Sequence, residues 1–286
     1  MLYIFLSIGC SLAVSIMLKL AKRYQIDVYQ AIVWNYSTAI LLSWILLKPQ
    51  FGHLTSAPIG IYLLLGLLLP LVFVLLSVSV KVSGIVRTDV AQRLSLVIPV
   101  IAAFLLFNEK PTSLKIIGIL LGLAAIVCTI PWQQGSGVQK RTNANAWIYL
   151  LMVFAGFGVI DVLFKQIAII KTVSYNTSLF YVFTMAFAFS LIGLIYQVAT
   201  KKMKFSWPHI LIGWGLGIAN FGNILFYLKA HRALADQPST VFSAMNIGVI
   251  VVGALTGLII FREKLSLLNK AGIVIAIIAV VIMAKS

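Results

Sequence analysis

The sequence is poor in charge, and above all in acidic groups. Only 10% of its 286 residues are charged and six are Asp or Glu, whereas 62% are hydrophobic. A soluble domain carries about 25% charged residues and could not cover this much apolar surface. The apolar runs also lack the polar–apolar alternation of transmembrane β-strands. We therefore expect an all-α integral membrane protein whose solvent is lipid.

Motifs of cofactor and enzyme chemistry are also missing. The two cysteines, Cys10 and Cys128, lie inside apolar runs, which excludes a disulfide framework and a zinc pattern. The sequence has no Walker loop, HExxH or GxSxG, so ATP drive and hydrolysis lack support. The first apolar run lacks a basic n-region and a cleavage site, so it is predicted to be a helix. We expect no enzyme, no cofactor and no metal.

The net charge of +16 does not predict a nucleic-acid partner. The basic residues stand singly or in pairs at the ends of apolar runs, where the positive-inside rule places them. Contact with lipid headgroups explains this pattern without a basic domain. The expected partners are therefore the lipid bilayer and a small-molecule substrate.

Ten apolar runs are long enough to cross a bilayer core of about 30 Å as helices. The predicted helices span residues 2–20, 28–47, 59–80, 85–107, 112–130, 146–169, 176–199, 208–231, 237–260 and 266–284. A Gly/Ser/Gln-rich linker, 131–145, separates residues 1–130 from 146–286. Each half thus holds five predicted transmembrane helices.

The two halves repeat each other. Phe107-Asn108-Glu109-Lys110 followed by Gly118 recurs as Phe261-Arg262-Glu263-Lys264 followed by Gly272, an offset of 154 residues (107 to 261). Near the start of each half, residues 15–19 parallel 161–165. Because five is an odd number, the second half is expected to be inverted in the membrane relative to the first. Inverted repeats are typical of secondary transporters.

This pattern resembles the EamA-type repeat of the drug/metabolite transporter superfamily. The resemblance covers the whole chain and implies a multi-pass carrier of the cell inner (plasma) membrane. It also implies a central cavity and a substrate among amino acids, sugars, nucleotide derivatives and drugs. The oligomeric state stays open between a monomer and a homodimer.

Charged and amide side chains inside the spans are the candidate substrate-binding groups, because ionisable groups in a span usually face a cavity or a partner. On the fourth predicted helix they are Arg87, Asp89, Gln92 and Arg93; on the eighth, Asn220, Asn223 and Tyr227; on the ninth, Ser243 and Asn246. The excess of arginine favours a ligand with a carboxylate. Alternatively, the first group lies in the headgroup zone and the amides only join helices.

Asp161 and Lys165 are the candidate proton-coupling residues. They are four apart on the sixth predicted helix, and Asp161, far inside the span, is expected to be the better buried of the two. A buried carboxylate can exchange a proton as its surroundings change. A static ion pair that joins helices explains the same residues. Glu109 and Glu263, by contrast, are expected to be structural caps at the repeated junctions.

These observations predict a secondary active transporter that moves a small organic metabolite by alternating access. The alternatives are a passive pore or scaffold and an intramembrane enzyme without a known motif. The charge rule places both termini outside, whereas the family resemblance places them in the cytoplasm. Substrate, direction and coupling ion stay open.

Overall fold

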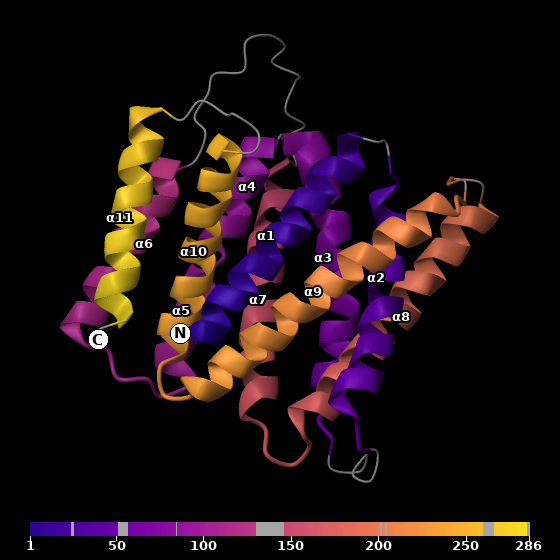
Figure 1. The fold of residues 1–286 in the computed structure, drawn as a ribbon, viewed down its shortest axis with the longest axis horizontal. Helices are drawn as coiled ribbons and strands as arrows, with labels where there is room; N and C mark the ends of the chain where they lie inside the picture. Colours follow the sequence, from indigo (N-terminus) through magenta and orange to yellow (C-terminus); the bar gives the residue numbers. More distant parts are fainter. Residues whose placement is uncertain are drawn as a thin grey trace. The chain divides into compact units, whose positions relative to one another are not determined.

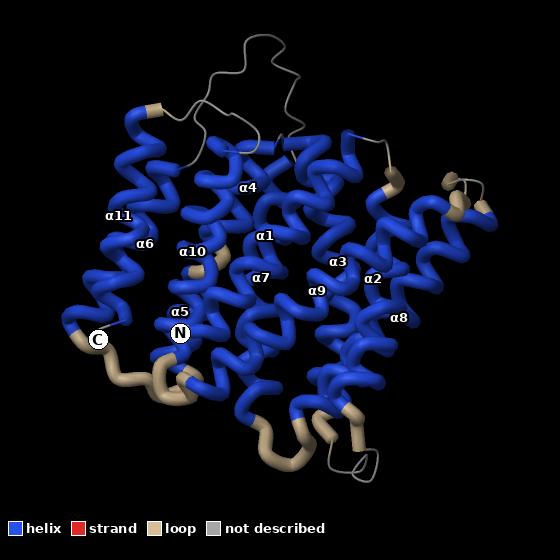
Figure 2. Tube along the Cα trace, viewed as in Figure 1, coloured by secondary structure: helices blue, strands red, loops and turns tan. Residues whose placement is uncertain are grey.

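Every regular element in the described part of the chain is helical. The computed structural model describes residues 1–23, 26–50, 57–83, 85–129, 146–200, 202–203, 205–259 and 266–284. Its helices are α1 (Leu2–Arg23), α2 (Val28–Leu42), the π-helical turn η1 (Ser43–Leu47), α3 (Ile59–Ser83), α4 (Ile85–Leu94), α5 (Val97–Leu105), α6 (Ser113–Thr129), α7 (Ala146–Ile169), α8 (Tyr175–Ala199), α9 (Pro208–Ala233), α10 (Pro238–Ile259) and α11 (Leu267–Ala284) (Figures 1 and 2).

The helices have the length and surface of membrane spans. Five are long and apolar enough to cross a bilayer: α2 continued by η1, α3, α7, α8 and α9. Shorter apolar helices occupy the other predicted spans. The outward side of α3 is itself apolar, since Leu63, Leu64, Leu67 and Leu71 are 41–45% exposed. A helix that is apolar on all its faces needs lipid on its outer side. The chain is therefore a multi-pass membrane protein.

The predicted helix 85–107 is interrupted, so the prediction of one continuous helix is wrong. A turn at Ser95 and Leu96 separates α4 from α5. Pro99 explains it, because proline has no N–H to donate to the carbonyl of Ser95 and its ring crowds that carbonyl. Instead, the N–H of Ile98 donates to the carbonyl oxygen of Ser95, at 3.0 Å. The break directly follows the polar residues of α4.

Short polar side chains define where several helices begin. In each case an oxygen accepts a hydrogen bond from the N–H three residues later, which satisfies a free donor of the first turn. The described caps are Asp27 to Gln30, Thr112 to Lys115, Ser174 to Thr177 and Ser266 to Asn269, at 3.1, 3.2, 3.3 and 3.1 Å. Thr112 and Ser266 are 154 residues apart, so the repeat extends to this cap.

The chain forms two compact units. Unit 1 comprises Met1–Val74 and Leu163–Arg232, and unit 2 comprises Leu75–Val162 and Ala233–Ser286. The predicted repeats, 1–130 and 146–286, divide the sequence differently. Each compact unit contains segments from both repeats.

In unit 1, α2 packs against α8 in the antiparallel direction. Near the start of α2, Tyr29 Oη donates a 3.0 Å hydrogen bond to the carbonyl oxygen of Ser190, late in α8. At the other end, the Asn176 amide, early in α8, donates to the carbonyl oxygen of Leu47, at 3.1 Å. The two helices therefore run in opposite directions.

In unit 2, α6 packs against α11, also antiparallel, and the two helices lie side by side in Figure 1. A Cβ atom on Gly118 would lie 2.5 Å from Cγ of Met283, and a Cβ on Gly122 would contact Ala279, one turn earlier in α11. The contact residues thus run in opposite directions along the two helices. Gly118 allows the close approach to α11 that GxxxG spacing favours, whereas the closest neighbour of Gly122 is Ile247 of α10.

GxxxG spacing also occurs at Gly213–Gly217 of α9 and Gly253–Gly257 of α10, and it favours close helix approach there too. Gly213 and Gly217 lie against the backbone of α2, where added Cβ atoms would be 2.7 and 2.6 Å from the carbonyl oxygens of Ala31 and Asn35. Close packing is therefore confirmed for this pair. At Gly253 a Cβ would meet nothing within 4 Å, so no described helix approaches this glycine closely. The surroundings of Gly257 lie outside the described part.

Candidate functional site

The polar face of α9 lies in unit 1. Asn220 and Tyr227 are only 8% and 6% exposed, and Asn223 is half-buried. The Ser7 hydroxyl of α1 lies 2.8 Å from both the backbone oxygen and Oδ1 of Asn223 and can donate to either. Asn223 therefore uses part of its hydrogen-bonding capacity to join α1 and α9. This matches the alternative that the amides join helices. Its amide N–H groups can still donate to a ligand.

His231 extends this face, and the sequence reasoning missed it. Its ring packs edge-on against that of Tyr227, with centroids 4.7 Å apart, and the side chain is fully buried. His231 stands near a helix end, which made it look peripheral. The signal was its spacing, because 220, 223, 227 and 231 follow one helix face.

On α7, Lys165 is more deeply buried than Asp161, which is the reverse of the order expected from the sequence. Lys165 is 1% exposed, whereas Asp161 is half-buried. The prediction that Asp161 is the better buried of the two is therefore wrong. Both side chains interact with neighbouring groups. This part of α7 is buried on several sides, since Phe164 and Ile167 are 3% and 0% exposed.

The charged face of α4 belongs to unit 2. Arg87 is exposed, whereas Gln92 and Arg93 are half-buried and Arg93 interacts with another group. Asp89 lies in α4, but its side chain is outside the described part of the structure. Thr88 is buried and shares a 2.8 Å hydrogen bond with Ser79. Of the two arginines, Arg93 is therefore the more buried.

α10 carries buried hydroxyls in the same unit. Ser243 and Thr240 are 0% and 1% exposed, and neither hydroxyl has a hydrogen-bond partner among the described residues. The amide of Asn246 donates to the Phe242 carbonyl oxygen at 3.0 Å. An unsatisfied buried polar group costs about 1–3 kcal/mol. Thr240, absent from the predicted site, therefore joins Ser243 as a candidate contact for a polar ligand.

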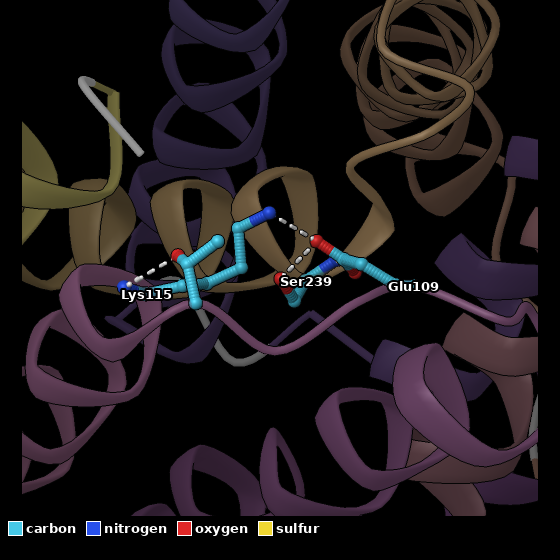
Figure 3. Close-up of polar contacts among 4 residues, drawn as sticks. Glu109, Lys115 and Ser239 are labelled. Atoms are coloured by element: carbon cyan, nitrogen blue, oxygen red, sulfur yellow. Dashed lines mark hydrogen bonds and ion pairs between the residues drawn. The ribbon is translucent and has the colours of Figure 1, made fainter.

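A buried ion pair lies at the start of α10 (Figure 3). Lys115 Nζ donates to Glu109 Oε1 at 2.7 Å, and the Ser239 hydroxyl donates to the same oxygen at 2.7 Å. The backbone N–H of Ser239 donates to Oε2 at 2.8 Å. Glu109 is thus a cap, as expected, but it caps α10 and its ionic partner is Lys115. Glu263 lies outside the described residues.

The backbone conformation of Asn108 explains how Glu109 reaches Lys115 and α10. Asn108 has a φ of 52°, the left-handed conformation that Asn tolerates better than most residues. The chain therefore turns sharply between α5 and α6 and carries Glu109 inward. Glu109 and Lys115 are 6% and 3% exposed, so their interaction is little screened by water.

In the described ranges, no three His, Cys, Asp or Glu side chains gather into one group. Cys10 and Cys128 are both free thiols of intermediate exposure. Among the described Lys, Arg, His, Asp and Glu side chains, the buried ones are Lys165, His231, Glu109 and Lys115. Such groups can bind or position charged ligands.

Comparisons with known proteins agree with this architecture. Residues 1–130 match the model of the EamA-like transporter family. An uncharacterized protein of Haemophilus influenzae is 42% identical over 283 residues, covering 96% of this chain and 94% of that protein. One protein of known crystal structure superposes with a TM-score of 0.73 over 98% of this chain and 94% of its own, at 13% identity. That likeness shows a shared fold.

Proposed function

Because this chain belongs to the EamA-like transporter family, we propose that it is a secondary active transporter that moves a small organic metabolite by alternating access. Members of this family are membrane transporters of small solutes, which is the observation that carries the proposal. We place the protein in the cell inner (plasma) membrane. Energy would come from an ion or solute gradient, since the sequence has no nucleotide-binding loop.

An inverted repeat supports alternating access. Two halves related by an axis in the membrane plane place equivalent helices antiparallel. α2 and α8 are equivalent by the repeat and pack antiparallel within unit 1; α6 and α11 do so within unit 2. Packing between equivalent helices also accounts for units that draw on both repeats. In this proposal, ten spans form two inverted groups of five.

The polar residues buried in the spans suggest the substrate class. We propose that Arg93 holds a carboxylate, because guanidinium presents two parallel donors to its two oxygens. Gln92, Ser243 and Asn246 in unit 2 supply further polar contacts, and Arg87 and Asp89 complete the charged face of α4. In unit 1, Asn220, Asn223 and Tyr227 are separate candidate polar contacts. A guanidinium beside amide and hydroxyl groups, as in unit 2, fits an amino acid-like solute.

Proton coupling through Asp161 would supply the energy. A coupling carboxylate must change its surroundings between two access states, because burial favours its neutral form and a nearby cation its charged form. Lys165 is that cation, four residues away on α7. Lys165 therefore acts as the fixed positive partner and Asp161 as the exchanging group.

Uptake into proteoliposomes tests this function. Purified protein is reconstituted, and individually labelled L-amino acids, sugars and nucleotide derivatives are supplied with and without an imposed proton gradient. We expect one class to accumulate above its external concentration only with the gradient. Equilibration without accumulation would indicate a passive pore. A chemically altered solute would indicate an enzyme. If no class of solute is taken up, the result would favour a scaffold.

A further inference from the structure

Glu109 joins two elements that are far apart in the sequence. It follows α5, whereas Ser239, 130 residues later, lies in the first turn of α10. Both carboxylate oxygens are used: Oε1 accepts from Lys115 and the Ser239 hydroxyl, and Oε2 from the Ser239 N–H. A carboxylate at a helix N-terminus also meets the positive end of the helix dipole. The start of α10 is therefore held by a charge.

The first turn of α10, which Glu109 holds at Ser239, lies next to the candidate substrate contacts on the same helix. Ser239 and Ser243 are four residues apart and so share one face of α10. Thr240 lies between them, and its hydroxyl, like that of Ser243, is buried without a described partner. A displacement of the first turn would move both hydroxyls. Glu109 thus acts on the site without touching a ligand.

The repeat-related positions carry different residues in the sequence. The 154-residue offset pairs Glu109 with Glu263 and Thr112 with Ser266, so the acid and the helix cap recur. Lys115, however, corresponds to Asn269, and Ser239 corresponds to Ile85. The sequence therefore does not repeat the ammonium group and the hydroxyl that contact Glu109.

We propose that Glu109 is a positioning residue for transport, which holds the first turn of α10 and thereby keeps Ser243 closed to the membrane face at which α10 begins. The proposal rests on the transport function above, and it adds an asymmetry between the repeats. Access from the α10 side requires the Glu109 contact to open.

Labelling of a single thiol tests this without knowledge of the substrate. Ser243→Cys is made in a background with Cys10→Ser and Cys128→Ser. A membrane-impermeant sulfonated maleimide is then added to one face at a time in oriented vesicles. Glu109→Gln keeps the shape but removes the charge. Glu263→Gln is the matched control at the repeat-related position.

We expect Glu109→Gln to raise the labelling rate about tenfold from the face at which α10 begins, because charge-assisted hydrogen bonds weaken by an amount of that order. Labelling from the opposite face should stay within about twofold, as should both rates in Glu263→Gln. A protein that is only destabilised would label faster from both faces. This sidedness separates positioning from general loosening.

Three results would overturn the proposal: unchanged labelling in Glu109→Gln, equal increases from both faces, or the same effect in Glu263→Gln. Ser239→Ala provides a milder variant if Glu109→Gln does not fold. It removes one of the two bonds from Ser239 and should give a smaller rise from the same face; no rise also counts against the proposal. Failure of Ser243→Ala to alter uptake would instead contradict the proposed substrate site.

Discussion

Lys115 and Glu109 form a salt bridge of 2.7 Å in which both side chains are nearly inaccessible to solvent. Removing one partner leaves a buried charge without compensation, which costs about 3–5 kcal/mol. We therefore expect Lys115→Met to lower the unfolding temperature in detergent strongly. Glu109→Gln combined with Lys115→Met removes both charges and should recover most of that loss. A double variant as unstable as the single one would show that the ion pair is not the cause.

Gly213 sets how closely α9 approaches α2. A methyl group there would press on the backbone carbonyl oxygen of Ala31, so Gly213→Ala should destabilise the protein by about 1–3 kcal/mol. Gly253→Ala is the matched control because its Cβ would meet nothing within 4 Å. Alanine also favours helix over glycine by about 1 kcal/mol. Thermal unfolding of both variants should separate them, and equal midpoints would contradict the packing described.

The two arginines of α4 are predicted to differ in transport. Arg93 is half-buried and Arg87 exposed. Arg93→Gln should weaken uptake of a carboxylate-bearing solute about tenfold or more, whereas Arg87→Gln should have a smaller effect because water screens its charge. The measurement is the concentration dependence of uptake in proteoliposomes, with protein abundance as the control. Equal losses would remove Arg93 from the proposed site.

Asp161→Asn tests energy coupling. An amide cannot exchange a proton, so accumulation driven by a proton gradient should stop. Exchange of internal for external solute needs no coupling proton and should persist. Both are measured with the same vesicles. Accumulation that survives the substitution would assign coupling to another group, whereas loss of both activities would indicate damage to the fold.

Two substitutions of His231 test whether its ring stabilises unit 1 by packing. Its full burial beside Tyr227 makes His231→Ala costly, because the substitution removes a large side chain from the core of unit 1. His231→Phe preserves most of the volume and the ring contact. We expect His231→Phe to retain the unfolding temperature of the parent within a few degrees and His231→Ala to lose more. Similar losses in both would point to a polar role of the imidazole in stability.

Much of the helical structure could be predicted because lipid imposes a local requirement. The predicted span 146–169 matches α7, and 208–231 falls two residues short of α9. The break between α4 and α5 was missed, although Pro99 was visible in the sequence. Uniform apolarity hides such a break, since hydropathy does not report the hydrogen bond that proline removes.

The candidate site could be predicted only in part. Polar residues inside apolar runs were recognisable, and three of those predicted to bind substrate, Asn220, Tyr227 and Ser243, are buried. His231 was missed because position along the helix says nothing about which neighbours cover a side chain. Lys165 proved more buried than Asp161 for the same reason. Burial depends on the facing helices, which a single sequence does not reveal.

The apolar helices, the 154-residue repeat and the family could be recognised from residue types at fixed spacing. Which polar groups meet depends on how the helices pack. Glu109 stands beside Lys110 in the sequence, yet it pairs with Lys115 and caps α10 at Ser239. That choice depends on a left-handed turn at Asn108 and on packing between distant helices. Hydrogen bonds and buried charges are satisfied by neighbours in space, and the chain reaches those neighbours only by folding.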